Sequence, residues 1–541
     1  MWGSVIRQGN KLRVIPESPH AAGFLMTYPG VGPDLTIPAT PAGLHMVKSL
    51  RLVISSDLEA QLSTPVPLGT GVPKVAGLRG YQVKGYQYVK AHGSSIIGDQ
   101  VGAGKSAQAI ALLADSIQDR PGLVVCPASL KTQWAREVRK WLGDGPSIQI
   151  IPDGKPIALT GDIVIVNYDI LAKHEFAIKR HKWSMMVADE AHYLKGWSTL
   201  RSKSMHRISY AMPLKVGLTA TPLVNRPRDL IQPLKILHRL DDLGGWEWYV
   251  TEFCRAYKTG NGWRFDDDFV PPHILKGLNH LLSQTCYIRR LKSDVAQELP
   301  PVTETVVALD VDLKEYRRTQ EQWIYDAIMG KRESVQLGEA SIVMIGKLRQ
   351  AVARAKVKPA LEFLDNLDGK TIVFAMHKEI QEALLAALPN ACHILSSDSK
   401  DERQRQADKF NDDPNVKYLI GGMGTSVTNS PAGVGWNLQA AENVVFVEIG
   451  WNPALHDQCI GRASRLTTTH PVNAWFLVVP RTIEVSIWNL NQRKKMTGDA
   501  VQDGLTPKMA MELLGDEGAE ILDTPQTWSA PYHVGAWTQA A

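Results

Sequence analysis

Cysteine is scarce in this sequence, and long apolar runs are missing. Five cysteines occur among 541 residues, and no two of them form a C-x-x-C pair. This usage argues against a zinc site and does not suggest a disulfide framework. No apolar run approaches the roughly 20 residues of a membrane-spanning helix, and the first residues lack the charged-then-apolar build of a signal peptide. We therefore expect a cytosolic setting and no membrane partner.

The sequence also lacks a strong charge of one sign, low-complexity segments, short-period repeats and sustained hydrophobic heptads. The net charge is +5 and the isoelectric point is near 8.7, which permits a nucleic-acid partner without requiring one. Apolar residues make up 44% of the chain and charged residues 21%, as in proteins with substantial cores. The length allows about three or four domains.

Short apolar runs alternate with helical periodicity from about residue 76 onward. Each run is nearly all apolar, which is typical of strands buried on both faces of a parallel sheet. The runs cover residues 123–126, 163–166, 185–188 and 216–218, and later 371–374, 418–420, 444–447 and 476–479. The pattern predicts an α/β protein with two parallel-sheet lobes.

Changes in composition suggest where the domains begin and end. The first segment is punctuated by Gly and Pro and holds short apolar pieces such as 50–54, which we read as strands. The segment between the lobes is aromatic and helical. The predicted divisions are a β-rich accessory module of unknown function at 1–75, lobe 1 at 76–240, a helical insertion and interlobe linker at 241–360, lobe 2 at 361–490, and a C-terminal helix and tail at 491–541.

Residues 96–106 form the stretch around which the chain is organised. Two β-branched residues end an expected strand, a glycine-bearing loop follows, and an expected helix begins near Lys105. Gly102 and Gly104 allow the backbone N–H groups to face an anion, and the helix N-terminus adds positive potential. Lys105 would reach the β- and γ-phosphates of a nucleotide, and Ser106 would ligate Mg²⁺. Asp99 stands where the general motif has its first glycine, so an ordinary loop remains the alternative.

A second motif, Asp189-Glu190-Ala191-His192, follows an expected buried strand. Ligand sites in parallel sheets lie at the carboxyl ends of strands. Two adjacent carboxylates repel each other unless a cation offsets their charge, and Mg²⁺ would do so. We expect Asp189 to hold the metal and Glu190 to orient and deprotonate the attacking water. The alternative is a helix start with acidic residues in its first turn.

Two further motifs complete the expected machinery. Hydroxyls at Thr219 and Thr221 end another expected strand and could relay between the hydrolysis site and lobe 2, although a plain turn is the alternative. Arg462 and Arg465 are three positions apart, so on a helix both would project from one face. A guanidinium group can bind the negative charge that is spread over the oxygens of a phosphate, so Arg465 is a candidate arginine finger. The alternative is a solvated helix face.

The set of motifs resembles the Swi/Snf-type ATPases of helicase superfamily two. The residues that carry the resemblance are 78–85, 99–106, 126–130 with Trp134, Glu137 and Trp141, 218–222 with Asn225, 288–295 with 299–301, 432–438, 451–453 and 458–465. In this family Asp at position 99 is expected, and Gln82 would read the adenine base. The resemblance implies two RecA-like lobes, ATP and Mg²⁺ as cofactors, and ATP hydrolysis coupled to movement along double-stranded or branched DNA.

The resemblance also assigns residues to binding roles. The expected ATP-binding residues are Gln82, Asp99, Gly102, Ala103, Gly104, Lys105 and Ser106. The expected catalytic residues are Lys105, Asp189, Glu190, Arg462 and Arg465, with Ser106 and Asp189 on Mg²⁺. The expected DNA-backbone contacts are Ser129, Lys131, Thr425 and Asn437. A basic stretch at Lys347, Arg349, Arg354, Lys356 and Lys358 is another DNA candidate, with a solvated helix face as the alternative.

Residues 253–256, 262–263 and 374–378 look most like the annealing-helicase (HARP-like) branch, which rewinds or remodels branched DNA. Three departures stand out: Ala103 and Ser106 replace Leu and Thr, Trp436 replaces Leu, and residues 465–467 lack the usual Gly-Gln ending. Rival interpretations are a strand-separating helicase, an ATPase that remodels a DNA-bound complex such as RNA polymerase, and a nucleotide-gated module without turnover. We expect a monomer from a bacterial or virus-infected cell, or a nuclear protein if the source is eukaryotic.

Overall fold

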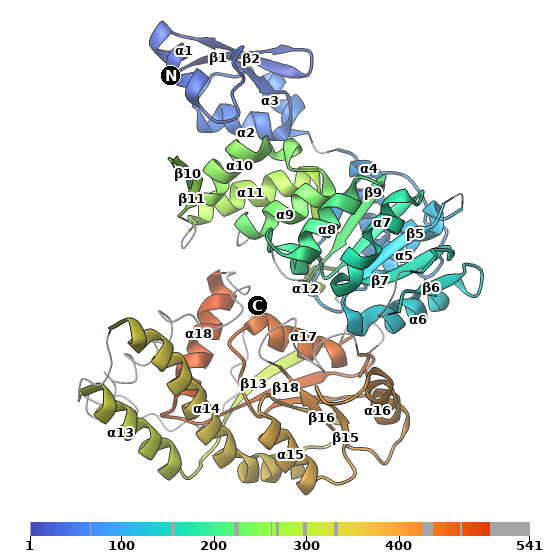
Figure 1. Ribbon diagram of the computed structural model, residues 1–541, viewed down its shortest axis with the longest axis vertical. Helices are drawn as coiled ribbons and strands as arrows, with labels where there is room; N and C mark the ends of the chain where they lie inside the picture. The colour runs from blue at the N-terminus through green and yellow to red at the C-terminus, as the bar shows by residue number, and fades with distance from the viewer. Residues whose placement is uncertain are drawn as a thin grey trace. The chain divides into compact units, whose positions relative to one another are not determined.

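The computed structural model consists of two compact units, residues 1–295 and 296–541, each described here by itself. Figure 1 shows the elements of both units, coloured along the chain. The structure describes residues 2–64, 66–118, 120–152, 157–220, 227–260, 262–266, 270–295, 300–328, 334–424, 436–465 and 468–497. Among the helices in these residues, none is long and apolar enough to cross a lipid bilayer.

The first unit is built on a seven-stranded parallel sheet with the strand order β12-β4-β9-β8-β5-β7-β6. Its strands are β4 (Ser95–Ile97), β5 (Gly122–Cys126), β6 (Ile148–Ile150), β7 (Ile163–Asn167), β8 (Met185–Asp189), β9 (Leu214–Leu218) and β12 (Tyr287–Ile288). Every residue of β5, β7 and β8 is buried, which explains why these strands read as unbroken apolar runs.

Helix α4 precedes this sheet, and helices also lie between its strands along the chain, as crossovers between parallel neighbours require. They are α4 (Gly80–His92), α5 (Lys105–Ser116), α6 (Lys131–Leu142), α7 (Leu171–Arg180), α8 (Leu200–Ser209) and α9 (Pro227–Leu237). Short 3₁₀ helices follow three of the strands, namely η1 (Ala128–Leu130), η2 (Tyr168–Ile170) and η3 (Ala191–Leu194). Because all the strands run in one direction, their carboxyl ends lie along one edge of the sheet, where the predicted motifs begin.

A three-stranded antiparallel sheet lies near the N-terminus, with helices packed beside it. Its elements are β1 (Gly3–Gln8), β2 (Lys11–Pro16), β3 (Thr36–Pro38), α1 (Pro19–Thr27), α2 (Pro41–Ser49) and α3 (Ser56–Ser63). The strand expected at 50–54 does not form, because only Val53 bridges to Ser4. This module shares one apolar core with the helical segment α10 (Gly245–Cys254) and α11 (Pro272–Thr285).

The second unit contains a six-stranded parallel sheet with the order β13-β18-β17-β14-β16-β15. Its strands are β13 (Val302–Ala308), β14 (Thr371–Ala375), β15 (Cys392–Ile394), β16 (Tyr418–Gly422), β17 (Asn443–Phe446) and β18 (Val472–Val478). The accompanying helices are α13 (Lys314–Ile328), α14 (Ser334–Asp365), α15 (Lys378–Ala387), α16 (Lys400–Asp412), α17 (Pro453–Ala463) and α18 (Ile483–Thr497).

The predicted fold class is confirmed, because both units carry an all-parallel main sheet and a small antiparallel sheet lies near the N-terminus. The region expected to hold the insertion and the linker, 241–360, contributes to both units: α10 and α11 pack in the first, and β13 pairs with β18 in the second. The predicted domain boundaries stay predictions. The helix expected at 507–514 lies outside the described residues.

Candidate ATP site

The phosphate-cradle motif has the predicted strand–loop–helix geometry. Strand β4 ends at Ile97, and α5 begins at Lys105 with Gly104 as its N-cap. Gly102 and Gly104 have φ angles of +76° and +70°, which lie in the left-handed region that glycine adopts without steric cost. Ser106 lies in the first turn of α5, where the backbone N–H groups have no partner within the helix. The loop therefore has the backbone needed to surround an anion.

Lys105 extends back into this loop. Its Nζ donates hydrogen bonds to the carbonyl oxygens of Asp99 at 2.8 Å and Gln100 at 3.3 Å. Burial lowers the pKa of the Lys105 amine, while the negative charges of Glu190, Asp99 and Asp189 oppose that shift. The structure thus brings the predicted lysine into electrostatic contact with the predicted carboxylate pair, 84 positions further along the chain.

Asp189 is buried at the end of β8, and its carboxylate is held on both sides. Its Oδ2 accepts a hydrogen bond from the indole Nε1 of Trp134 on α6 at 2.8 Å, and its Oδ1 accepts one from the Glu190 backbone N at 2.9 Å. Burial and the neighbouring Glu190 charge raise the pKa of Asp189 to about 6, against the hydrogen bond from Trp134 and the charge of Lys105. A cation placed here would favour the charged carboxylate.

Glu190 occupies a strained position in the turn after β8. Its φ angle is +51°, and it caps the 3₁₀ helix η3, so no α-helix begins at these acidic residues. Left-handed backbone at a non-glycine residue costs of order 1–3 kcal/mol and often marks a functional site. Its Oε2 lies 3.2 Å from Nδ1 of His192, and that nitrogen lies 3.4 Å from Oγ1 of Thr219. His192 thereby links the carboxylate pair to the end of β9, while Thr221 lies outside the described residues.

The Asp99 carboxylate is committed to contacts inside the first unit, and the expected role of this residue in binding the nucleotide stays a prediction. Its carboxylate is fully buried and accepts hydrogen bonds from Arg290 Nε at 2.9 Å, Arg290 Nη2 at 2.5 Å and Gln108 Nε2 at 2.9 Å. Arg290 Nη2 also donates to Gln108 Oε1 at 2.9 Å. Asp99 therefore fastens the cradle to Arg290 by a bidentate ion pair.

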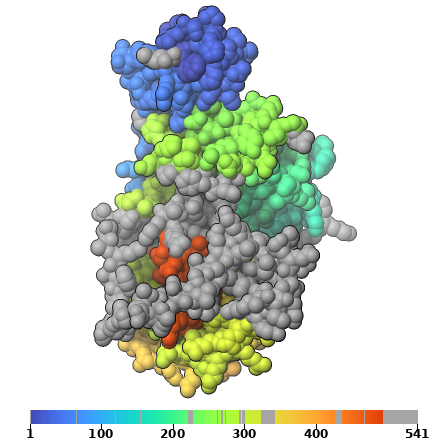
Figure 2. All heavy atoms as spheres, turned by 90° about the vertical axis from the view of Figure 1, so that its left-hand side faces the viewer, coloured from blue at the N-terminus to red at the C-terminus, as the bar shows by residue number. Residues whose placement is uncertain are grey.

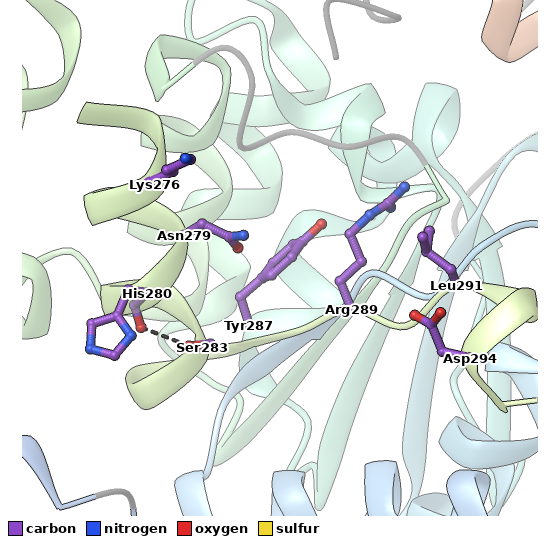
Figure 3. A pocket seen from close by; sticks show the side chains of 8 residues that line it. All are labelled: Lys276, Asn279, His280, Ser283, Tyr287, Arg289, Leu291 and Asp294. Atoms are coloured by element: carbon purple, nitrogen blue, oxygen red, sulfur yellow. Dashed lines mark hydrogen bonds between the residues drawn. The ribbon is translucent and has the colours of Figure 1, made fainter. Parts of the chain in front are cut away.

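Arg289 and Arg290 come from the segment that forms β12. This strand pairs in parallel with β4, so the chain at 287–290 runs beside the entry to the cradle. Arg289 Nη1 donates to the carbonyl oxygens of Gly98 at 2.8 Å and Ala220 at 3.1 Å. Figure 3 shows Arg289 beside Tyr287. Both residues line a cavity of about 570 Å³, and residues of α11 line it too. The sequence motif predicts no particular role for these two arginines.

Gln82 holds the start of α4 against the cradle. Its Oε1 accepts a hydrogen bond from the Arg79 backbone N at 2.9 Å, and its Nε2 lies 3.5 Å from the carbonyl oxygens of Ala103 and Gly104. The neighbouring Tyr81 hydroxyl donates to the Ala103 carbonyl oxygen at 3.0 Å. The predicted base-reading residue is therefore at the cradle, although buried, and its contact with adenine stays a prediction.

Comparison with known proteins gives two family matches. Residues 81–356 match the SNF2-related domain, and residues 355–467 match the helicase conserved C-terminal domain. The chain belongs to the SNF2-related family. The resemblance stated from the sequence motifs is thereby confirmed, and the matched ranges contain all the predicted site residues.

Relatives of this SNF2-related chain include proteins named as DNA annealing helicase and endonuclease ZRANB3. The bovine and human proteins are each 26% identical to it over 463 and 460 residues, covering 82% of this chain and 42% of theirs. The Xenopus tropicalis protein named SWI/SNF-related matrix-associated actin-dependent regulator of chromatin subfamily A-like protein 1 is 27% identical over 426 residues, covering 76% of this chain and 43% of its own. The chain thus spans less than half the length of these relatives.

Among solved structures, the Sulfolobus solfataricus SWI2/SNF2 ATPase core in complex with dsDNA matches with 23% sequence identity and a TM-score of 0.39. The match covers 85% of this chain and 97% of that one. The ATPase core domain from the same organism matches with 21% identity and a TM-score of 0.37, covering 83% and 98%.

The residues of the SNF2-related chain that are expected to contact DNA differ in their exposure to solvent. Ser129 in η1 is half-buried and Asn437 is exposed, so both can be reached from solvent, while Thr425 lies outside the described residues. Lys131 is 6% exposed, and its Nζ donates to the carbonyl oxygen of Ile151 at 2.8 Å. Its amine therefore serves the interior of the first unit, which argues against the predicted phosphate contact.

The basic stretch on α14 is neither a continuous solvated face nor a continuous DNA surface. Lys356 is fully buried and bonds to Glu484 at 2.8 Å and to the Leu477 carbonyl oxygen at 2.6 Å. Arg349 is buried and donates to the Ile449 carbonyl oxygen at 2.6 Å. Arg354 is exposed and forms ion pairs with Glu379 and Glu315. Lys347 and Lys358, the remaining members of this set, are both exposed.

Arg462 and Arg465 do not share a helix face, because α17 ends at Ala463 with Ser464 as its C-cap. Arg462 is buried, and its Nε donates to the Gln458 carbonyl oxygen at 3.2 Å. Arg465 lies beyond the cap, where its Nη2 donates to the Trp436 carbonyl oxygen at 2.7 Å. The two guanidinium groups are thus held by separate backbone carbonyls, and their roles toward a nucleotide stay predictions.

Proposed function

We propose that this protein is an ATP-driven motor that moves along double-stranded DNA and remodels branched DNA. The observation that carries the proposal is the convergence of three groups at one sheet edge: the cradle lysine Lys105 and the carboxylates of Asp189 and Glu190, whose charges act on one another. Relatives whose names include annealing helicase support the choice of DNA as the substrate.

Each group would have a distinct role. The Lys105 amine would release the two backbone carbonyl oxygens that it now contacts and bind the β- and γ-phosphates of ATP. Glu190 would orient and deprotonate the attacking water. Ser106 and Asp189 would hold Mg²⁺. Burial and the adjacent Glu190 charge raise the pKa of Asp189, and a bound cation would offset both effects, which supports this assignment. In the described residues no group of three or more His, Cys, Asp or Glu side chains could hold a metal alone. Phosphate and water oxygens would therefore complete the ligands, as Mg²⁺ prefers, and the ion would neutralise charge on the phosphates.

The second unit would contribute the remaining charge. Arg462 and Arg465 are proposed to stabilise the transferred phosphoryl group, with Arg465 as the finger. Each donates to a backbone carbonyl oxygen, and a phosphate oxygen could replace that acceptor at a gain in charge complementarity. Catalysis would then depend on the arrangement of the two lobes, which couples hydrolysis to motion. Ser129, Asn437 and Thr425 are the proposed contacts to the DNA backbone.

The test is ATP hydrolysis with no nucleic acid, single-stranded DNA, blunt duplex, forked duplex and RNA. We expect strong stimulation by duplex and forked DNA and little by RNA. Equal turnover in all five conditions would remove DNA from the proposal. Stimulation by RNA polymerase but not by naked DNA would replace it with a protein-remodelling ATPase.

A second assay separates movement from strand separation. We expect the protein to displace the third strand of a DNA triplex while leaving an ordinary duplex paired. Release of a fluorescent strand from a duplex without triplex displacement would instead identify a strand-separating helicase.

A further inference from the structure

A partly exposed cluster of aromatic rings lies on the first unit, on elements distant in sequence. Trp197 follows η3 and is 47% exposed, which is high for so large an apolar side chain. Its ring centre lies 6.3 Å from that of Trp246 on α10, with the planes 27° apart, and 6.1 Å from that of Phe265 at the end of β11 (Gly262–Phe265), with the planes 81° apart. Figure 2 shows the green face of this unit where α10 and β11 lie.

Two cations from α9 cover the edges of this cluster. The Arg228 guanidinium carbon lies 4.4 Å from the ring centre of Phe265 and 5.9 Å from that of Trp197. Lys235 Nζ lies 4.1 Å from the ring centre of Trp246. The two residues are seven positions apart, which places them on one side of the helix, two turns from each other. We call these five residues the aromatic–cation surface.

Ordinary core packing explains only part of this arrangement. Trp246 and Phe265 rest on the apolar core of the first unit, so their rings are fixed in place. Trp197 comes from a different segment, lies against these two rings and leaves nearly half of its surface to solvent. Fixed rings with an exposed member and flanking cations are suited to hold a flat, negatively charged ligand.

The ligand that fits this chemistry is an unpaired nucleotide. Exposed bases stack on aromatic side chains whatever their identity, and nearby Lys and Arg side chains bind the phosphates. Within a duplex the faces of the bases are covered by their neighbours, so only a single-stranded segment can use such a surface. We propose that the aromatic–cation surface binds the single-stranded arm of a branched DNA.

The surface is also joined to the candidate ATP site through the chain. Trp197 lies seven residues after Glu190, and the 3₁₀ helix η3 covers residues 191–194 between them. The Tyr193 backbone N donates to the Glu190 carbonyl oxygen at 2.9 Å, which makes this connection short and firm. A nucleotide on Trp197 would therefore act on the segment that carries the proposed catalytic base. This inference rests on the proposed function and names the DNA structure that the motor prefers.

The test compares three probes: an oligothymidylate of about 20 nucleotides, a blunt duplex, and the same duplex with a single-stranded arm. We expect Trp197→Ala to weaken binding of the oligothymidylate roughly 5- to 150-fold, the range for the loss of one stacked base. It should also remove the preference for the forked duplex, while affinity for the blunt duplex and its stimulation of ATP hydrolysis stay unchanged. Trp197→Phe should restore most of the binding, because a ring remains.

Phe176→Ala is the matched control. Phe176 on α7 is 73% exposed and also lies near a guanidinium, with Arg180 at 5.2 Å, but outside the aromatic–cation surface. This variant should bind all three probes as the parent does. Lys235→Gln should reduce the slope of the logarithm of single-strand affinity against the logarithm of salt concentration by about 0.7, the value for one phosphate contact.

The outcomes separate this inference from the proposed function. If Trp197→Ala binds the oligothymidylate and the forked duplex as tightly as the parent, the inference is wrong, and duplex-stimulated hydrolysis still supports the motor. If the parent protein binds none of the DNA probes and no DNA stimulates hydrolysis, the proposed function fails first. Equal losses in Trp197→Ala and Phe176→Ala would also overturn the inference, because they would show no special role for this surface.

Discussion

The two acidic residues at the end of β8 differ in environment, and this difference suggests different roles. The Asp189 carboxylate receives hydrogen bonds from Trp134 and from the Glu190 backbone, so it is held in one orientation. Glu190 sits in left-handed backbone, with its carboxylate 3.2 Å from a nitrogen of His192. A fixed carboxylate suits a metal ligand, and a carboxylate beside an imidazole suits an acid–base residue.

Replacing the proposed base should abolish stimulated turnover without unfolding the protein. Glu190→Gln keeps the shape of the side chain but cannot accept a proton, so DNA-stimulated ATP hydrolysis should fall about 10²- to 10⁴-fold. Steady-state kinetics measures the fall, and circular dichroism checks the fold. Glu382→Gln, at an exposed position on α15, serves as the control and should hydrolyse ATP normally. Normal turnover in Glu190→Gln would rule out its role as base.

The raised pKa of Asp189 predicts a pH effect with a definite sign. Its charged form is the proposed metal ligand, so hydrolysis should decline as the pH falls through about 6. The hydrogen bond from Trp134 lowers this pKa, so Trp134→Phe should move the acid limb of the kcat/KM profile to higher pH. Trp183→Phe removes a comparable buried indole N–H, bonded to the Ile178 carbonyl oxygen, and should leave the limb in place. A shift in both variants, or in neither, would contradict the role given to Trp134.

The same pKa has a consequence for stability. Asp189 binds its proton more tightly when folded, with a pKa of about 6, than at the usual value of 3.8. Between about pH 4 and 6 the native state therefore holds more protons at this site than the unfolded state. The contribution of Asp189 to the free energy of unfolding must then decrease as the pH rises through that range. Urea unfolding without nucleotide or metal, at several pH values, would show this contribution as the difference between the parent and Asp189→Asn.

Single charged residues were the hardest to interpret from the sequence. Lys105, Asp189 and Glu190 were found because each belongs to a motif with a fixed place relative to a strand end. The pairing of Asp99 with Arg290 could not be predicted, because Arg290 lies 191 positions away and no local sequence pattern indicates the pair. The burial of the Lys131 amine could not be predicted for a related reason, because it depends on packing that sequence periodicity does not report.

Among the elements, strand β12 is very short but has a large effect on the candidate site. It has two residues, yet its pairing with β4 leads Arg289 and Arg290 to the cradle. The Arg290 guanidinium then spans Asp99 on the loop and Gln108 on α5. Helix α4 closes over this junction, and Gly85 is the point of closest approach. A Cβ built there would lie 1.9 Å from Gln108 Oε1 and 2.6 Å from Arg290 Nη2.

This contact predicts opposite effects of the same substitution at two positions of α4. Gly85→Ala should lower the free energy of unfolding by about 1–3 kcal/mol, the usual cost of overpacking, because Gln108 and Arg290 must move. Gly80→Ala, at the first residue of α4, meets nothing within 4 Å and should be neutral or stabilising by up to about 1 kcal/mol. Urea unfolding of both variants measures the contrast. Equal effects would mean that the Arg290 junction is not tightly packed.

Element prediction succeeded where a strand is long enough to show its own pattern. The five-residue strands β5, β7, β8 and β14 are buried along their whole length and were all predicted from apolar runs. Strand β12 is too short for any periodicity, and β13 has mostly half-exposed residues, so neither was predicted. The Arg462–Arg465 spacing suggested one helix face, but α17 stops between the two residues.

At the scale of the whole chain, the N-terminal module belongs to the first compact unit and shares its apolar core. Leu12, Met46 and other residues of the module pack in the same core as Trp248 and Leu278 of the helical segment. His45 Nε2 and Ser49 Oγ each lie 3.1 Å from the Glu252 carboxylate across this junction. The sequence indicated a boundary from its Gly and Pro content, but it could not show the packing, which joins residues some 200 positions apart.

The motor proposal requires that many phosphates be gripped at once, which predicts a steep effect of salt. The logarithm of duplex affinity should fall linearly with the logarithm of salt concentration, with a slope near −0.9 for each phosphate contacted. Fluorescence anisotropy of a labelled blunt duplex measures this slope.

Ser129→Ala should weaken binding at every salt concentration but keep the slope, because a hydroxyl carries no charge. Lys131→Ala should also keep the slope, because its amine is committed to the Ile151 carbonyl oxygen, and should instead lower the free energy of unfolding by about 1–3 kcal/mol. A flat salt response would remove phosphate contacts from the mechanism, and a slope reduced by about 0.9 in Lys131→Ala would restore this lysine as one of them.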